Sequence, residues 1–516
     1  MQNLVRGLRS AARHHGSRPA LLDASRTVTW TEFEQRVACA AGALRALGVE
    51  PGARFGILAR NGFRHEELKW AGIWLGAVPV PINFRLAPPE IAHILEDAWC
   101  THVLVETPFL PAFDHPSLAA YRDRLTHIGE TSGAGGEPYE QLLAAAAPAA
   151  PCDPDLDADA ILLYTGGTTG RGKGVRLSHG NVVASSLGFA LGTGARPDQV
   201  YCHAAPMFHS ASLLATGWML QGAAQCFLPM FSPAAFLETI RRYRVGAVVT
   251  VPTMLIATLS DPAFAKADVS SLRVLIYGAA PMAVEWIDRV AAAFPDAALY
   301  NCYGLTETGP DITVFDAAEF RAAIEHFRRT GERLPHLTSI GKPNVLNEVR
   351  VVAPDGRELP AGEVGELVVR GRNVMLGYLN RPEETRATLR DGWLHTGDVA
   401  RIDADGYVHL LDRLKDMVIT GGENVYSSEV EEVLFAHPAV QEAAVIGIPD
   451  ARLGEMVMAV IALKPGAAAT EDEIVAHCRA SLGGFKVPRR LAFLPQLPKS
   501  AVGKVLKTEI RKQFAR

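Results

Sequence analysis

A glycine-rich loop near residue 170 constrains this chain more than any other feature. Residues 164–175 read Tyr-Thr-Gly-Gly-Thr-Thr-Gly-Arg-Gly-Lys-Gly-Val and follow the apolar run 161–163, which predicts a buried strand. A loop of this composition exposes successive backbone N–H groups, and its hydroxyls and lysine add further donors that suit a polyphosphate. On its own, the loop also fits an ordinary glycine-rich surface turn.

The same loop departs from the Walker A pattern of kinases and ATPases. Gly167, four further residues, Gly172 and Lys173 match that pattern, but Gly174 stands where it needs Ser or Thr. That hydroxyl would hold Mg²⁺. The sequence therefore argues against a nucleotide-binding protein of the Walker A class.

The first half of the chain alternates strands and helices. A capping box of Thr31 and Glu34 predicts the start of a helix that ends at Gly48. Strands are predicted at 55–58, 78–81, 103–105, 247–251, 273–277 and 298–301, and helices at 66–75, 91–96, 233–243 and 283–294. Such alternation indicates mostly parallel sheets covered by helices, which is an α/β fold.

The hydrophobic period changes to two beyond about residue 340. Segments 348–352 and 366–370 predict short strands of a small β-barrel subdomain, and a separate α+β unit follows from about residue 416. We therefore expect a large N-terminal domain over residues 1–414, with two helix-covered sheets and the barrel. A small C-terminal domain is expected over residues 415–516.

The composition excludes several classes of protein. The chain of 516 residues is 48% hydrophobic and 21% charged, as expected for a globular protein of two or three domains. Its 51 basic and 56 acidic residues give a net charge of −5, which argues against a nucleic-acid partner. The chain has no 18-residue apolar run, and arginines stand near its N-terminus, where a signal peptide needs apolar residues. Its seven cysteines are scattered. These features predict a cytoplasmic protein with reduced thiols.

Three further motifs carry groups suited to a nucleotide. The segment 303–307 follows a predicted strand and offers an aromatic ring, a glycine, a hydroxyl and a carboxylate, which could stack a base, bind phosphate and hold Mg²⁺. Asp398, expected on a tight turn, could accept both ribose hydroxyls, with Arg413 and Lys415 nearby. Lys504 follows Gly503 near the C-terminus, where a basic tail is the alternative.

Together these motifs resemble those of the adenylate-forming enzymes, which include acyl- and aryl-CoA ligases, nonribosomal-peptide adenylation domains and firefly luciferase. The resemblance covers nearly the whole chain, and the segment Gly421-Gly422-Glu423-Asn424-Val425-Tyr426 is most similar to bacterial CoA ligases for fatty and aromatic acids. The motifs stand in the family's order at 164–175, 206–209, 278–281, 303–307, 395–398, 413–416, 421–424 and 504. The chain departs from the family at Gly166 and Gly172, often Ser and Pro, and at Ser427, often Pro, a change expected to loosen that loop.

The resemblance implies a ligase that uses ATP, Mg²⁺ and coenzyme A and forms an acyl adenylate. It implies that Glu307 and Thr168 bind the metal, and that Lys415 is the hinge of a mobile C-terminal lid carrying Lys504. The implied catalytic residues are Lys504, Thr306, Glu307 and His209, the last of these more as a wall or gate than as a base. The implied cofactor-binding residues are Thr165, Gly166, Gly167, Thr168, Thr169, Lys173, Gly278, Ala279, Ala280, Tyr303, Gly304, Asp398, Arg413, Gly421, Gly422 and Glu423.

The acid substrate is expected to lie against residues 206–214, 277–280 and 301–305. A medium- to long-chain fatty acid is the first expectation; the alternatives are an aryl or arylalkanoic acid, and loading of the acyl group onto a carrier protein. The basic helix predicted at 320–333 suits either a solvated surface or contact with anionic lipid. The C-terminal cations between 486 and 516 suit either solvent or the phosphates of coenzyme A. The family suggests a homodimer.

Overall fold

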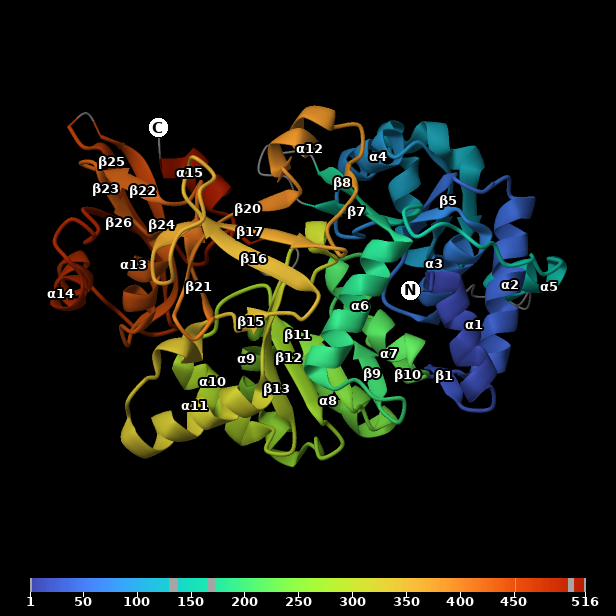
Figure 1. Cartoon of the computed structure of the whole chain (residues 1–516), viewed down its shortest axis with the longest axis horizontal. Coiled ribbons are helices and arrows are strands. Elements are labelled where there is room, and N and C mark those ends of the chain that lie inside the picture. Colours follow the sequence, from blue (N-terminus) through green and yellow to red (C-terminus); the bar gives the residue numbers. More distant parts are fainter. Residues whose placement is uncertain (1, 130–137, 166–171, 451, 500–504, 515–516) are drawn as a thin grey trace. The chain divides into compact units, whose positions relative to one another are not determined.

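The computed structural model describes residues 2–129, 138–165, 172–450, 452–499 and 505–514 (Figure 1). Contacts divide the chain into two compact units. Unit 1 comprises Met1–Val349 and Val369–Leu394, and unit 2 comprises Arg350–Val368 and His395–Arg516. This division does not fall between residues 414 and 415, so the expected boundary of the mobile domain stays a prediction.

The main sheet of unit 1 has nine strands in the order β15-β14-β13-β12-β11-β9-β10-β1-β2. Its central pairs, from β13 to β1, are parallel, and β2, β14 and β15 add antiparallel pairs at the two edges. The strands are β1 (Pro19–Leu22), β2 (Thr27–Thr29), β9 (Val200–His203), β10 (Ala224–Phe227), β11 (Ala247–Thr250), β12 (Val274–Gly278), β13 (Ala298–Tyr303), β14 (Thr313–Phe315) and β15 (Lys342–Pro343).

Two smaller sheets complete unit 1. The first is parallel, in the order β4-β3-β5-β6, and the second is antiparallel, in the order β18-β8-β7. Their strands are β3 (Arg54–Leu58), β4 (Val78–Pro81), β5 (Cys100–Val105), β6 (Leu125–His127), β7 (Asp159–Thr165), β8 (Lys173–Ser178) and β18 (Gly377–Tyr378). The two helix-covered parallel sheets predicted from the alternating pattern are therefore confirmed.

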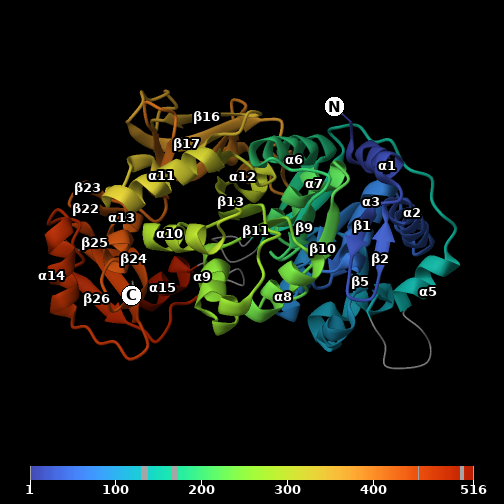
Figure 2. The same ribbon diagram turned by 90° about the horizontal axis from the view of Figure 1, so that it is seen from below.

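Helices cover these sheets. Figure 2 shows α6 and α7 on one side of β9–β11 and α8 and α9 on the other. The helices of unit 1 are α1 (Leu4–His15), α2 (Trp30–Ala46), α3 (Phe63–Leu75), α4 (Pro88–Asp97), α5 (Pro138–Ala145), α6 (His179–Thr193), α7 (Thr216–Leu220), α8 (Pro233–Tyr243), α9 (Pro252–Ser260), α10 (Val284–Ala293), α11 (Ala317–Thr330) and α12 (Pro382–Thr388). Within the described ranges, every helix is too short or too polar to traverse a bilayer.

The start of α2 differs from its prediction. Thr29, not Thr31, is the N-cap: its hydroxyl accepts from Glu32 N, and the Glu32 carboxylate accepts from Thr29 N. The sequence offers the same Thr-x-x-Glu spacing twice, two residues apart. Trp30 decides between them, because it is fully buried and packs edge-on against Phe33 from the first turn of the helix.

Two further sheets include the strands of unit 2. The first has the order β16-β17-β20-β19, with β21 also on β20, and the second has the order β23-β22-β25-β24, with β26 on β25. Their strands are β16 (Asn347–Val352), β17 (Val364–Gly371), β19 (Leu389–Arg390), β20 (Trp393–Ile402), β21 (Val408–Arg413), β22 (Val418–Thr420), β23 (Glu423–Val425), β24 (Val440–Asp450), β25 (Gly454–Leu463) and β26 (Arg490–Phe493). The helices α13 (Ser427–Phe435), α14 (Glu471–Ser481) and α15 (Lys507–Phe514) complete the expected α+β unit.

Candidate active site

Two expected nucleotide-binding segments of unit 1 meet at the carboxyl ends of adjacent parallel strands. β12 and β13 pair in register, with Gly278 opposite Cys302. Ala279 and Tyr303 follow directly, so the two segments leave the sheet side by side. Ligands of open α/β sheets bind beyond this end of the strands. The structure therefore brings these two predicted segments together.

The backbone of both segments depends on small residues. A Cβ atom on Gly278 would lie 2.5 Å from the carbonyl oxygen of Cys302, and one on Gly304 would overlap the carbonyl group of Pro310. Ala279 is exposed and has φ +66°, a left-handed conformation that non-glycine residues rarely adopt. Such a conformation costs on the order of 1–3 kcal/mol and is concentrated at ligand sites. This edge is thus shaped for a closely approaching ligand.

Thr306 and Glu307 lie in a short 3₁₀ helix after β13. The Thr306 hydroxyl donates to Ser210 Oγ at 3.1 Å. The Glu307 carboxylate accepts a hydrogen bond from the Tyr378 hydroxyl at 2.8 Å. Burial, and then the charge of Glu307, raise the pKa of Tyr378, so its hydroxyl remains a donor. These contacts fix the direction of the Glu307 carboxylate.

The groups at this turn suit Mg²⁺. A carboxylate and a hydroxyl are hard oxygen ligands, and Mg²⁺ is usually held by one or two carboxylates together with substrate phosphates. In the part of the chain that the structure describes, no cluster of three His, Cys, Asp or Glu side chains could form an all-protein metal site. Glu307 therefore fits the predicted metal ligand, and Thr168 lies outside the described residues.

The predicted phosphate loop joins β7 to β8, and the structure describes its two ends. Thr165 and Lys173 face each other across this antiparallel pair. The Lys173 ammonium forms an ion pair with Glu384 on α12 and lies 5.0 Å from the ring centroid of Tyr378. The predicted phosphate ligands outside the described residues are Gly166, Gly167, Thr168 and Thr169.

Sequence reasoning misses Tyr378 and Glu384, although both contact predicted site residues. β18 places Tyr378 opposite Val175 on β8, and Glu384 stands in the first turn of α12. Both are far from Lys173 along the chain, and neither belongs to a pattern with a chemical meaning of its own. The local signal is slight: a Gly-Tyr pair shortly before a helix that begins with proline.

Asn61 fixes the loop that is expected to line the acid site. Its side-chain nitrogen donates to the carbonyl oxygens of His203 at 3.0 Å and Ala205 at 2.9 Å. Its side-chain oxygen accepts from Met207 N at 2.8 Å. His209 then caps the start of the following 3₁₀ helix. The role of His209 as a wall residue or as an acid–base group stays a prediction.

The wall is apolar and partly aromatic. Met207 and Phe208 are buried. The ring of Phe208 packs edge-on against Phe84 with centroids 5.4 Å apart, and Phe84 stacks on Phe109 with centroids 5.1 Å apart. Residues 206–214 include no Asp, Glu, Lys or Arg. A hydrocarbon or aromatic acid fits this wall better than an amino acid, whose ammonium group would need a partner.

A buried polar cluster on α3 accompanies this loop and was not predicted. Lys69 Nζ lies 2.7 Å from the Glu66 carboxylate, which also accepts from Trp70 Nε1 at 2.8 Å. Burial lowers the pKa of His65 to about 3 and that of His203 to about 4. Both imidazoles are therefore neutral in the folded chain near neutral pH.

In unit 2, the two predicted ribose ligands contact each other. Asp398 on β20 stands opposite Arg413 on β21, and Arg413 Nε lies 3.0 Å from Asp398 Oδ1. The expected tight turn at Asp398 is wrong, because the residue lies within β20, which is kinked at Gly397 with φ +70°. Gly397 N donates to the Glu366 carboxylate at 3.1 Å, which holds this kink.

The region of the predicted hinge lies just beyond β21. Lys415 is exposed, and partial desolvation, with Arg413 next, lowers its pKa. The adjacent Asp416 is anchored by Arg511, with Nη1 2.8 Å from Oδ1. Lys504, the predicted catalytic lysine, lies outside the described residues.

The segment predicted to face the pantetheine arm forms a β-hairpin. Gly421 and Gly422 join β22 to β23 with φ +61° and +85°, the positive values that two-residue type I′ turns require. Glu423 follows and is exposed. The Ser427 hydroxyl donates to Asp412 Oδ2 at 2.7 Å and ties α13 to β21, and the expected loosening at this position stays a prediction.

Most C-terminal cations that were considered for coenzyme A already have acidic partners within unit 2. The ion pairs are Lys486–Glu429, Lys499–Glu442, Lys507–Glu431, Arg511–Asp416 and Lys512–Glu509. In unit 1, Arg328 of the basic helix α11 pairs with Asp288. Both roles considered for these cations, binding of coenzyme A and contact with lipid, stay predictions.

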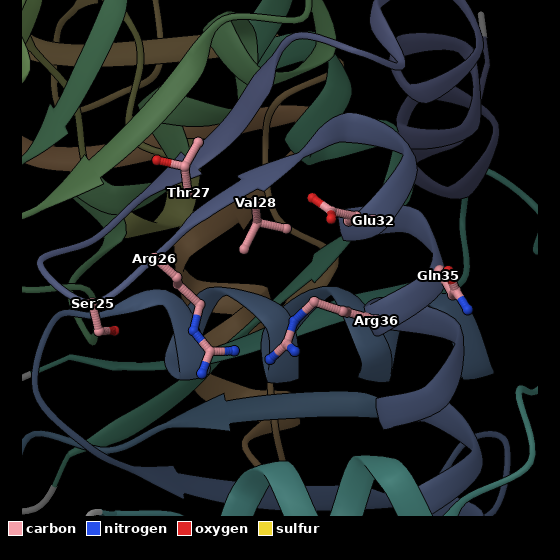
Figure 3. Close-up of a pocket in the computed structure, with 7 residues that line it drawn as sticks. All are labelled: Ser25, Arg26, Thr27, Val28, Glu32, Gln35 and Arg36. Carbon is pink, nitrogen blue, oxygen red and sulfur yellow. The ribbon is translucent and has the colours of Figure 1, made fainter.

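A surface hollow of about 460 Å³ is lined by residues of β2, the turn before it and α2, none of which is a predicted site residue. Figure 3 shows the side chains of Arg26 and Arg36 extending toward each other, with their guanidinium groups side by side. Both arginines contact Glu140, and Arg36 also binds the buried Glu67. Its lining residues are Ser25, Arg26, Thr27, Val28, Glu32, Gln35 and Arg36. The hollow is therefore an internally neutralised surface feature.

Comparisons with known proteins agree with this geometry. The model of the AMP-binding enzyme family matches residues 8–379, and that of the AMP-binding enzyme C-terminal domain matches residues 429–504. A feruloyl-CoA synthase of Amycolatopsis sp is 40% identical over 98% of this chain and 96% of its own. The fatty acid–[acyl-carrier-protein] ligase ScoC of Streptomyces coeruleorubidus is 32% identical over 100% and 97%. The crystal structure of ATP-bound MatB from Rhodopseudomonas palustris superimposes with a TM-score of 0.89 at 31% identity, covering 100% of this chain and 99% of that one.

Proposed function

This chain belongs to the AMP-binding enzyme family, and from that premise we propose that it is an aryl-acid:CoA ligase. The chain is an AMP-forming acyl-CoA synthetase that uses ATP and coenzyme A. The acid is the proposed part. The buried wall of Met207 and Phe208, with the Phe208 ring edge-on to Phe84, suits an aryl or an alkyl acid, and the preference for an aryl acid rests on sequence similarity. The similarity to a feruloyl-CoA synthase supports the same substrate class.

The reaction of this family proceeds in two chemical steps. A carboxylate oxygen attacks the α-phosphorus of ATP, the bond to the β-phosphate breaks, and acyl adenylate and pyrophosphate form. The thiol of coenzyme A, losing its proton, then attacks the acyl carbon, and AMP leaves with the former carboxylate oxygen. Both steps build negative charge, so fixed donors and cations directed at that charge supply most of the rate enhancement.

We assign the nucleotide to residues that contact or adjoin each other in each unit. In unit 1, the ends of β12 and β13 would hold the adenine, and Thr306 would donate to the α-phosphate. Lys173 would bind the outer phosphates. In unit 2, Asp398 would accept from the ribose hydroxyls, with Arg413 holding its carboxylate.

Mg²⁺ would be held by Glu307, with Thr168 as the second predicted ligand, and would supply charge neutralisation at the phosphates. Glu307 itself is kept oriented by the Tyr378 hydroxyl. His209 would shape the acid wall without exchanging protons.

Lys504 would neutralise the substrate carboxylate and the α-phosphate as they approach each other. Two anions at bonding distance repel strongly in a site of low dielectric constant, and an ammonium between them removes that barrier. Rotation about Lys415 would then exchange Lys504 for the hairpin Gly421–Glu423, which would line the path of the pantetheine thiol. The domain boundary between residues 414 and 415 is part of this proposal.

The thiol acceptor defines a second candidate. ScoC is named as a ligase for an acyl-carrier protein, so a carrier-bound pantetheine is an alternative to coenzyme A. AMP release that requires holo carrier protein, and that coenzyme A does not support, would establish this alternative.

We place the enzyme in the cytoplasm, with a homodimer as the family-based expectation. Contact with anionic lipid through α11 would be excluded if charge reversal there left liposome co-sedimentation unchanged.

A panel of acids tests the substrate class. Pyrophosphate release and thioester formation should be measured with hydroxycinnamic, phenylalkanoic and benzoic acids and with fatty acids of increasing length. We expect the highest kcat/KM for an arylpropenoic or arylalkanoic acid. A kcat/KM that instead rises steadily with the length of a saturated chain would establish the fatty-acid alternative.

A further inference from the structure

We propose that Tyr378 is a positioning residue that couples the lysine of the phosphate loop to the metal-binding carboxylate. The inference rests on the proposed roles of Lys173 and Glu307. It adds to them a third residue that sets the position of one group relative to the other.

Tyr378 contacts both groups through different parts of its side chain. Its hydroxyl donates to Glu307 Oε1 at 2.8 Å and is also hydrogen-bonded to the side chain of Thr388. The ammonium of Lys173 lies 5.0 Å from its ring centroid, within the roughly 6 Å range of a cation–π contact. A single rigid side chain therefore spans from the end of the phosphate loop to the turn that carries Glu307.

The backbone around Tyr378 makes the same connection. At the start of segment 375–379, Met375 N donates to the main-chain carbonyl of Glu307 at 2.8 Å. At its end, Leu379 N donates to Gly174 O at 2.8 Å, next to Lys173. A movement of either site element would thus be transmitted to Tyr378 through hydrogen-bonded main chain.

Glu384 is a further partner of Lys173, but its ion pair with the lysine is weak. It pairs with Lys173, but the two side chains are 41% and 27% exposed, so water competes for both charges. A polyphosphate, with several charges, can take the ammonium away from this one carboxylate. The Tyr378 ring stays beside the ammonium in either case and restricts where it can move.

Three substitutions at Tyr378 separate the two contacts. Tyr378→Phe keeps the ring and removes the hydroxyl, whereas Tyr378→Leu and Tyr378→Met remove both, so that one folded variant of these two suffices. The readout is calorimetric binding of a non-hydrolysable ATP analogue, α,β-methylene-ATP, in Mg²⁺ and in EDTA. In EDTA, Tyr378→Phe should bind the analogue with an affinity within twofold of that of wild type. The factor by which Mg²⁺ raises this affinity should be about tenfold smaller in Tyr378→Phe than in wild type. The ring-free variant should also lose roughly three- to tenfold in EDTA.

Thr470→Ala is the control. Thr470 also donates a hydroxyl hydrogen bond to a carboxylate, that of Glu473 at 2.9 Å, at the start of α14. Its loss should lower thermal stability to a similar extent and leave the Mg²⁺-dependent gain unchanged. An equal loss of that gain in both variants would mean that Tyr378 acts only by stabilising the fold, and would overturn the proposal.

Two background variants distinguish the coupling from the proposed function. In Glu307→Gln, Tyr378→Phe should cause no further loss of the Mg²⁺-dependent gain. In Lys173→Met, the leucine and phenylalanine variants should bind equally in EDTA. If Glu307→Gln and Lys173→Met change binding but the Tyr378 substitutions do not, the coupling is wrong. If Glu307→Gln or Lys173→Met itself binds like wild type, the proposed role of that residue fails first.

Discussion

Asp398 and Arg413 stand directly opposite each other on β20 and β21, with Arg413 Nε 3.0 Å from Asp398 Oδ1. Asp398 is 4% exposed, so its carboxylate is held in place before any nucleotide binds. A fixed acceptor costs less entropy on binding than a free one. In the role that we propose, this pair would thus present a preorganised acceptor to the two hydroxyls of a ribose.

Asp398→Ala should weaken ATP binding by roughly 10- to 100-fold, because hydrogen bonds to a charged group contribute about 1.5–3 kcal/mol. Binding of pyrophosphate, which has no ribose, should not change. Asp403→Ala is the control, because Asp403 bonds His409 at 2.7 Å next to the same two strands. Calorimetry that shows equal losses for ATP in both variants would contradict the ribose assignment.

Lys504→Ala should abolish pyrophosphate release and leave conversion of a supplied acyl adenylate to thioester intact. The loss should reach roughly 10²–10³-fold, as for other groups that stabilise transition-state charge. Lys499→Ala removes a nearby cation that already pairs with Glu442 and should affect neither step. Equal loss of both half-reactions in Lys504→Ala would refute its assignment to adenylation.

Lys415→Pro should have the opposite effect, since proline fixes one of the two backbone dihedrals about which the lid would rotate. Pyrophosphate release should persist, and thioester formation should fall by at least tenfold, about 1.4 kcal/mol. Stopped-flow measurement of the two steps separates them. An undiminished second step would remove Lys415 as the hinge.

Gly278→Ala should distort the proposed nucleotide site, because the new methyl group would lie 2.5 Å from the carbonyl oxygen of Cys302. This oxygen belongs to the backbone and cannot easily move away. Overpacking of this kind costs about 1–3 kcal/mol. ATP affinity and the melting temperature should both fall. Gly484→Ala, where a Cβ would meet no atom within 4 Å, should leave both unchanged.

His65 predicts an acid-labile contribution to stability. Burial lowers its folded pKa to about 3, so in moderately acidic solution the unfolded chain binds a proton that the folded chain excludes. The contribution of His65 is therefore complete above its unfolded pKa of about 6.5 and is lost as pH falls, by about 1.4 kcal/mol per pH unit. Urea unfolding of wild type and His65→Gln at pH 7, 6 and 5 measures the difference. A pH-independent difference between the two would show that His65 does not stay neutral in the fold.

Short sequence patterns predicted those helices and strands whose bounds are set by neighbouring residues in the chain. The segment Val78–Pro81 is a strand and Pro233–Tyr243 a helix, with the expected bounds. The family resemblance assigned residues 278–280 and 303–304 to one nucleotide site. The structure shows that the strands before them, β12 and β13, are adjacent and parallel and end at one edge of the sheet.

The rest depends on tertiary packing. α3 carries His65, Glu66 and Lys69, residue types that are usually exposed, yet the fold buries them all. Tyr378 reaches Glu307 only because β18 pairs with β8, a pairing that no short pattern encodes. The two Thr-x-x-Glu boxes before α2 are equivalent in sequence, and the burial of Trp30 selects between them.

Isotope transfer tests the central claim of an acyl-adenylate most directly. The enzyme should be supplied with its acid labelled with ¹⁸O at both carboxylate oxygens, together with ATP and coenzyme A, and the products analysed by mass spectrometry. The account predicts one labelled oxygen in AMP for each thioester formed, because the attacking oxygen leaves with AMP. Label in inorganic phosphate or pyrophosphate, or AMP without label, would contradict it.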